Sequence, residues 1–252
     1  MHVYIYDSYI NQKKYDKAIA MIETRLTDLG LNGKIARLGL MKNIPDLVQN
    51  ELKRGAKTIT AVGNDQTVCQ VINALAGNAA PLGIIPVGKN NNFIATSLGI
   101  TSSQEACDIL SARRIMKLDL GRANQNFFLA NANITTLGTI VEIDQDYSIE
   151  TAESGIVNIV NFTTGEEKLP ISSTQNKFNP TDGILEFFIV TGQDRKFLKK
   201  ITGKSIFSFK SLTIINKDYP VILDQVLKIS TPVEISVAKQ ILNVIVGKER
   251  SF

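Results

Sequence analysis

The sequence has few of the residues that enzymes most often use for nucleophilic or metal chemistry. Its 252 residues include one histidine, His2, and two cysteines, Cys69 and Cys107, which lie far apart. A Ser-His-Asp or Cys-His mechanism needs a histidine inside the fold, and a zinc site needs clustered Cys or His ligands. The sequence offers a basis for neither, and two isolated cysteines are typical of a reducing compartment.

Long apolar runs are also missing. A transmembrane helix requires about 18 or more consecutive apolar residues, and no such run occurs. The first residues lack the basic region and apolar core of a signal peptide. Hydrophobic residues make up 44% and charged residues 21%, as in ordinary globular proteins. We therefore expect a cytoplasmic protein without a transmembrane segment, and any membrane contact would be peripheral.

The net charge of +4 is mild, and the lysines and arginines are scattered. This charge suits an acidic ligand such as a phosphate, or weak attraction to an anionic membrane. No basic stripe with interleaved aromatic residues is present, so we expect no nucleic-acid partner.

Strand and helix patterns alternate over the first part of the chain. Short apolar strands are predicted at 3–6, 34–40, 57–62 and 82–86, each followed by a helical pattern. Repeated units of this kind predict an α/β nucleotide-binding domain over 1–114, built on a parallel sheet. From 115 to 252 the pattern predicts a β-sandwich of short strands, with one helix over 194–201 and two final strands over 233–237 and 241–246. The C-terminal segment could return to the first domain.

Two polar loops follow neighbouring strands of the predicted sheet, at 62–67 and 86–93. Ligands bind at the carboxyl ends of parallel strands, and helix N-termini attract phosphate. Asp65 could hold a magnesium ion, and Lys89 could meet a phosphate as a point charge. The same Asn and Asp residues would equally serve as ordinary helix caps. Two such loops at successive strand ends favour a pocket.

Segment 61–100, AVGNDQTVCQVINALAGNAAPLGIIPVGKNNNFIATSLGI, resembles the catalytic domain of the diacylglycerol kinase and sphingosine kinase family of lipid kinases, which share their core with NAD kinases. The family pattern is Gly-Gly-Asp-Gly-Thr, a helix, Pro-Leu-Gly-Ile-Ile-Pro, and then Gly-Thr-Gly-Asn-Asp-Phe-Ala. Weaker similarity extends over 117–134, 182–185 and 221–246. The resemblance implies an NAD kinase/diacylglycerol kinase-like fold, with ATP and Mg²⁺ bound in a cleft between the domains. It also implies transfer of a phosphoryl group to a diacylglycerol- or sphingoid-like alcohol.

Several positions of the family pattern are changed. Asn64 and Gln66 replace glycines of the first motif, and Val226 stands where the family has its catalytic glutamate. The loop after the first strand, at 6–11, has no glycine, whereas the family has an Asn-Pro-x-Ser-Gly-type phosphate loop there. The nucleotide-binding residues that the resemblance implies are Gly63, Asn64, Asp65, Gln66, Thr67, Gly88, Lys89 and Asn91. It also implies that Asp65 is catalytic and binds the metal, and that Asp224 is catalytic as a substitute base.

These changes leave two main hypotheses. One is a divergent ATP-dependent lipid kinase, because phosphoryl transfer depends mostly on positioning and charge neutralisation. The alternative is a pseudokinase that keeps the fold and binds a nucleotide or lipid without transferring phosphate. Transfer to a soluble acceptor such as NAD is a weaker third hypothesis. The acceptor, the nucleotide preference and the oligomeric state stay open.

Overall fold

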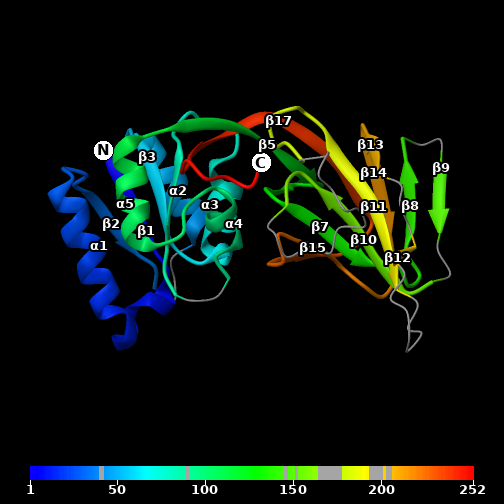
Figure 1. The fold of residues 1–252 in the computed structure, drawn as a ribbon, viewed down its shortest axis with the longest axis horizontal. Helices are drawn as coiled ribbons and strands as arrows, with labels where there is room; N and C mark the ends of the chain where they lie inside the picture. The colour runs from blue at the N-terminus through cyan, green and yellow to red at the C-terminus, as the bar shows by residue number, and fades with distance from the viewer. Residues whose placement is uncertain are drawn as a thin grey trace. The chain divides into compact units, whose positions relative to one another are not determined.

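The computed structural model shows two compact units (Figure 1). Unit 1 comprises Met1–Leu118 and Gln240–Ser251, and unit 2 comprises Asp119–Lys239 with Phe252. The residues that the structure describes are 1–39, 43–88, 91–144, 147–150, 153–163, 178–192, 201–202 and 206–252. Lys89 and nearly all of the helix expected over 194–201 lie outside these residues.

Unit 1 contains a parallel sheet, as the sequence predicts. Its strands follow the order β2-β1-β3-β4-β17, and all neighbours in this order pair in parallel. The bounds of these strands are β1 His2–Tyr6, β2 Gly33–Arg37, β3 Thr58–Gly63, β4 Leu82–Pro86 and β17 Val233–Ile245. Every residue of β3 and β4 is buried, so both faces of the sheet centre are covered.

Five α-helices and two short 3₁₀ turns connect and cover these strands. They are η1 Ser8–Asn11, η2 Lys13–Tyr15, α1 Asp16–Asp28, α2 Ile44–Lys53, α3 Asp65–Leu75, α4 Phe93–Ser97 and α5 Ser103–Ala112. The loops after β1, β3 and β4 all leave the same edge of the sheet, because parallel strands end on the same side. This arrangement brings η1, η2 and the first turns of α3 and α4 together.

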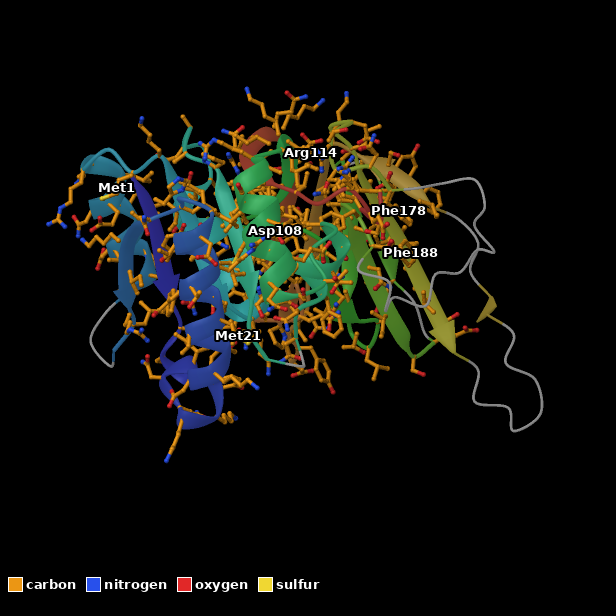
Figure 2. The ribbon with its side chains drawn as sticks, turned by 60° about the vertical axis from the view of Figure 1, so that its left-hand side comes forward. Met1, Met21, Asp108, Arg114, Phe178 and Phe188 are labelled. Atoms are coloured by element: carbon orange, nitrogen blue, oxygen red, sulfur yellow. The ribbon has the colours of Figure 1, made fainter. Side chains whose placement is uncertain are left out.

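Unit 2 is built from antiparallel strands that form two sheets. One has the order β12-β11-β10-β7-β15-β16 with β13 beside β11, and the other pairs the first part of β17 with β14, then β8 and β9. Both sheets contribute to one apolar core, which includes Phe187 of β11 and Leu212 of β14. The predicted β-sandwich is therefore confirmed. Phe178 stacks on Phe188 of β11, with ring centroids 6.3 Å apart (Figure 2).

The remaining strands in the described residues are short except for β5 and β11. Their bounds are β5 Ile115–Ala123, β6 Asn126–Phe128, β7 Asn131–Thr135, β8 Ile140–Ile143, β9 Tyr147–Glu150, β10 Gly155–Val160, β11 Leu185–Gly192, β12 Ile201–Thr202, β13 Phe207–Phe209, β14 Ser211–Ile215, β15 Val221–Leu223 and β16 Leu227–Ile229.

The two final strands expected over 233–237 and 241–246 form one strand, β17. Gln240 interrupts the pattern with φ 49° but does not end the strand. A single residue in the left-handed region bends a strand without forming a turn, which explains the difference. The C-terminal part of β17 lies in unit 1, where Val244 pairs with Leu82 of β4. The described residues contain no helix with the length and apolar character needed to span a bilayer.

Candidate functional site

The first turn of α3 contains the residues that the sequence predicts to bind phosphate. Here the Asn64 side chain accepts hydrogen bonds from the N–H groups of Gln66 (3.1 Å) and Thr67 (3.4 Å). The N–H of Asp65 donates to the Asn91 carbonyl (2.8 Å), and the N–H of Val68 donates to the Asn64 carbonyl (3.1 Å). A helix normally leaves its first four N–H groups without an intrahelical partner. In α3 the N–H groups of Asp65, Gln66 and Thr67 are paired by contacts outside the helix ladder, and Val68 makes the first intrahelical bond.

Asp65 joins the first turn of α3 to that of α4. Its side chain is buried, with 3% of its surface exposed. One carboxylate oxygen accepts the N–H of Phe93 (2.8 Å), and the other accepts the N–H of Ile94 (3.2 Å). A carboxylate at a helix N-terminus is favoured by the amide donors and by the helix dipole. The geometry thus gives Asp65 a capping role. Its metal-binding and catalytic roles stay predictions.

Gly63 and Thr67 pack against the loop that follows β1. The Thr67 hydroxyl donates a hydrogen bond to the Asp7 carboxylate, and Thr67 is fully buried. A Cβ atom added to Gly63 would lie 2.5 Å from Thr67 Oγ1 and 3.2 Å from Asp7 Cβ. Close packing of the protein itself therefore requires glycine at position 63. Gln66, by contrast, is exposed.

A cavity of about 470 Å³ lies beside these loops. It is lined by Tyr9, Lys14, Tyr15, Asn64, Val87, Gly88 and Asn91. Ligand sites for small molecules commonly occupy about 300–1,000 Å³, so the volume suits a nucleotide-sized ligand. Three of the predicted nucleotide-binding residues, Asn64, Gly88 and Asn91, meet at this cavity.

Two tyrosines and a lysine of the cavity wall come from the segment after β1. The rings of Tyr9 and Tyr15 meet edge to face at 5.5 Å, and the Lys14 ammonium lies 4.9 Å from the centre of the Tyr15 ring. The Tyr9 hydroxyl donates to the Val87 carbonyl (2.6 Å). Burial, with the Asp7 charge next, raises the pKa of Tyr9, so this hydroxyl keeps its proton. These three residues were not predicted, although β1 ends at the same sheet edge as β3 and β4.

Asp224 lies in the turn between β15 and β16 of unit 2. Its carboxylate accepts three backbone hydrogen bonds, from Leu129 (2.8 Å), Ala130 (2.7 Å) and Asn131 (3.1 Å). The residue is buried, with 7% of its surface exposed. The carboxylate therefore fixes the loop before β7. Val226, two residues later, closes the same turn by donating its N–H to the Leu223 carbonyl (2.8 Å).

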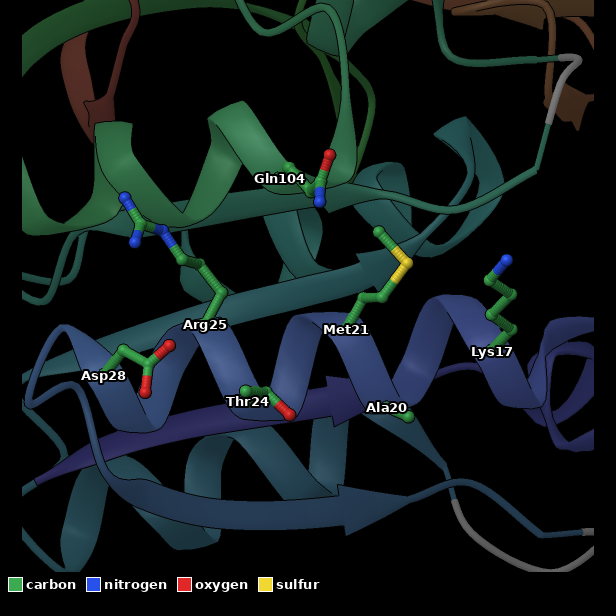
Figure 3. Close-up of a pocket in the computed structure, with 7 residues that line it drawn as sticks. All are labelled: Lys17, Ala20, Met21, Thr24, Arg25, Asp28 and Gln104. Carbon is green, nitrogen blue, oxygen red and sulfur yellow. The ribbon is translucent and has the colours of Figure 1, made fainter.

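A second cavity of unit 1 lies along α1 (Figure 3). It measures about 390 Å³ and is lined mainly by α1 residues, among them Lys17, Met21 and Arg25, with Gln104 contributed by α5. Arg25 also bonds Asp108 of α5 (3.0 Å). None of the predicted site residues lines this cavity, so we do not assign it to the candidate site.

The residues of the first cavity fit a nucleotide better than they fit a magnesium ion. Magnesium prefers carboxylate oxygens, and no carboxylate lines this cavity. Among the described residues, no group of three His, Cys, Asp or Glu side chains could hold a metal ion. An ammonium, two aromatic rings and two side-chain amides offer contacts to a phosphate, a base and a sugar.

Comparisons with known proteins identify the fold and show which proteins the chain is similar to. A diacylglycerol kinase from Bacillus anthracis str. Sterne has a similar crystal structure, with a TM-score of 0.73 at 20% identity, over 98% of this chain and 96% of that chain. The two units thus have the fold of the diacylglycerol kinases. Residues 2–123 match the family model of the diacylglycerol kinase catalytic domain. Over this part the chain is therefore similar to the diacylglycerol kinases, as the resemblance predicted.

Two curated relatives agree with this family. The chain is 29% identical over 160 residues to a diacylglycerol kinase of Bacillus subtilis (strain 168), and 29% identical over 119 residues to a probable lipid kinase YegS of Salmonella newport (strain SL254). These matches cover 61% and 45% of this chain, but only 49% and 40% of the relatives. The chain thus matches half or less of each relative's length.

Proposed function

We propose that this chain is a nucleotide-binding relative of the lipid kinases that has lost phosphoryl transfer. One observation carries the proposal: the two carboxylates expected to perform chemistry hold backbone amides. Asp65 accepts two N–H groups and Asp224 accepts three. Val226 supplies no carboxylate where the family has its glutamate. Loss of a general base lowers a rate by about 10²–10⁴-fold.

The cavity beside Asn64 and Gly88 supports nucleotide binding. Its lining residues come from the loops after β1, β3 and β4, and ligands of open parallel sheets bind at these strand ends. We place ATP or a related nucleotide here. In the family ATP supplies the phosphoryl group, and Mg²⁺ usually accompanies it. In this chain Lys14, Asn64 and Asn91 offer donors to the nucleotide.

A second candidate is a slow ATP-dependent kinase that acts on a diacylglycerol- or sphingoid-like alcohol. Retention of Asp65 and Asp224 favours it, because the resemblance identifies both positions with the family's site. Phosphoryl transfer depends mainly on positioning and electrostatics, so a weakened site could retain some turnover. The cleft between the domains, the cytoplasmic location and peripheral contact with a membrane stay predictions under either candidate.

Binding is tested first, by thermal unfolding of the whole chain with millimolar AMP, ADP or ATP, with and without Mg²⁺. A ligand that binds only the native state raises Tm, so at least one nucleotide should do so. No shift with any nucleotide, together with no displacement of a fluorescent nucleotide, would overturn both candidates.

Transfer is tested second, with γ-labelled ATP and a panel of diacylglycerols, sphingoid bases and NAD. We expect no labelled product from the native chain. Val226→Glu restores the family's side chain and serves as the matched variant. Turnover that appears only in this variant would support binding without transfer. Turnover by the native chain would support the slow kinase instead.

A further inference from the structure

Helix N-termini normally offer unpaired backbone N–H groups to a phosphate, but at this site several of these groups are already hydrogen-bonded within the protein. In α3 the N–H groups of Asp65, Gln66 and Thr67 donate to Asn91 or Asn64, and in α4 those of Phe93 and Ile94 donate to Asp65. A phosphate can bind these amides only by displacing existing hydrogen bonds. A cationic side chain therefore adds the positive charge that these paired amides do not supply to an anionic ligand.

Lys14 supplies that charge in the cavity. Of the described residues that line the cavity, Lys14 is the one with a positive charge, and none of them is an Asp or a Glu. Among the described parts of the chain, no Asp or Glu forms a salt bridge with Lys14. The Tyr15 ring 4.9 Å from the ammonium restricts its position, because a cation is attracted to the face of an aromatic ring.

A single ammonium neutralises only part of a triphosphate. ATP normally relies on a divalent cation and several donors to balance its charge, but no carboxylate is among the described residues that line this cavity. A nucleotide with one or two phosphates carries less charge and suits one lysine better. We propose, on the basis of the proposed function, that the cavity binds a nucleoside mono- or diphosphate without metal, and that Lys14 contacts its phosphate.

The experiment measures dissociation constants of the whole chain for AMP, ADP and ATP by calorimetry, in EDTA and in Mg²⁺. AMP or ADP should bind more tightly than ATP in EDTA, and Mg²⁺ should not improve the binding of AMP or ADP. Lys14→Gln should weaken ADP binding at least about tenfold, because a charge-assisted contact to phosphate is lost. Added salt should weaken ADP binding to the native chain more than to this variant.

Two matched variants separate Lys14 from other lysines. Lys13→Gln removes an exposed charge next to Lys14 that does not line the cavity, and it should leave ADP affinity within about twofold. Lys89→Gln removes the lysine that the sequence predicts to meet phosphate. The inference is overturned if Lys89→Gln, and not Lys14→Gln, weakens ADP binding, or if Mg²⁺-ATP binds most tightly. If no nucleotide binds the native chain, the proposed function fails as well. Unchanged circular dichroism spectra confirm that each variant folds.

Discussion

Asp65→Asn should destabilise the protein if the carboxylate acts chiefly as the cap of α4. The native carboxylate accepts the N–H groups of Phe93 and Ile94 at 2.8 Å and 3.2 Å, with only 3% of the residue exposed. Asparagine keeps one oxygen and turns an N–H₂ group toward the other donor. Hydrogen bonds to a charged acceptor contribute about 1.5–3 kcal/mol, and an unsatisfied buried donor costs about 1–3 kcal/mol. We expect a loss of about 2–3 kcal/mol.

Thermal unfolding followed by circular dichroism measures this loss. For a chain of this size each kcal/mol lowers Tm by about 2–4 °C, so Asp65→Asn should lower it by about 4–12 °C. Asp28→Asn is the matched control, because Asp28 is exposed at the end of α1; it should change stability by less than about 0.5 kcal/mol. An equal or higher Tm for Asp65→Asn would refute the capping argument, since neutralising a buried carboxylate kept for a metal would relieve its desolvation.

Three further predictions concern other parts of the chain. Asn64→Ala removes the cap of α3 and should cost about 1 kcal/mol in urea unfolding; an unchanged midpoint would contradict the cap. Gly121→Ala places a Cβ 1.9 Å from the Phe128 ring and should cost about 1–3 kcal/mol, a penalty that Phe128→Leu in the same chain should reduce. Burial, and then the Asp182 charge, raise the pKa of Glu186 from 4.5 to about 7, so native stability should fall as pH rises between these values. Glu186→Gln should remove this pH dependence and raise the free energy of unfolding by about 1–2 kcal/mol above pH 7, after allowance for solvent screening. If the stability–pH curves of the variant and the native chain run parallel, the raised pKa of Glu186 is excluded as the cause.

The fold was predictable because its signals are local. The start of α5 shows such a local signal: the Ser102 side chain accepts the N–H of Glu105 (3.2 Å), and the Glu105 carboxylate accepts the N–H of Thr101 (3.2 Å). The buried strand expected at 57–62 is β3, Thr58–Gly63. Such signals depend on neighbours within a few residues, so the sequence alone reveals them.

The candidate site was only partly predictable because its contacts join distant segments. Both the binding and the capping interpretations of Asp65 were open from the sequence, and the partners of its carboxylate lie 28 and 29 residues away. Tyr9 reaches Val87, 78 residues later. No periodicity or spacing indicates such partners. The loss of glycine after β1 was a signal that this segment differs, but it did not show that Lys14 would line the cavity.

Strand β17 belongs to both units. Its first part pairs with β14 in unit 2, and Val244 pairs with β4 in unit 1. Beyond it, the N–H groups of Gly247 and Ser251 donate to the carbonyls of Leu98 and Ser97. A fragment that ends at residue 118 would lack these partners and would leave β4 as an open edge, which favours aggregation. Unfolding of either unit would break the pairing of this shared strand. Calorimetry of the whole chain should therefore record one cooperative transition instead of two.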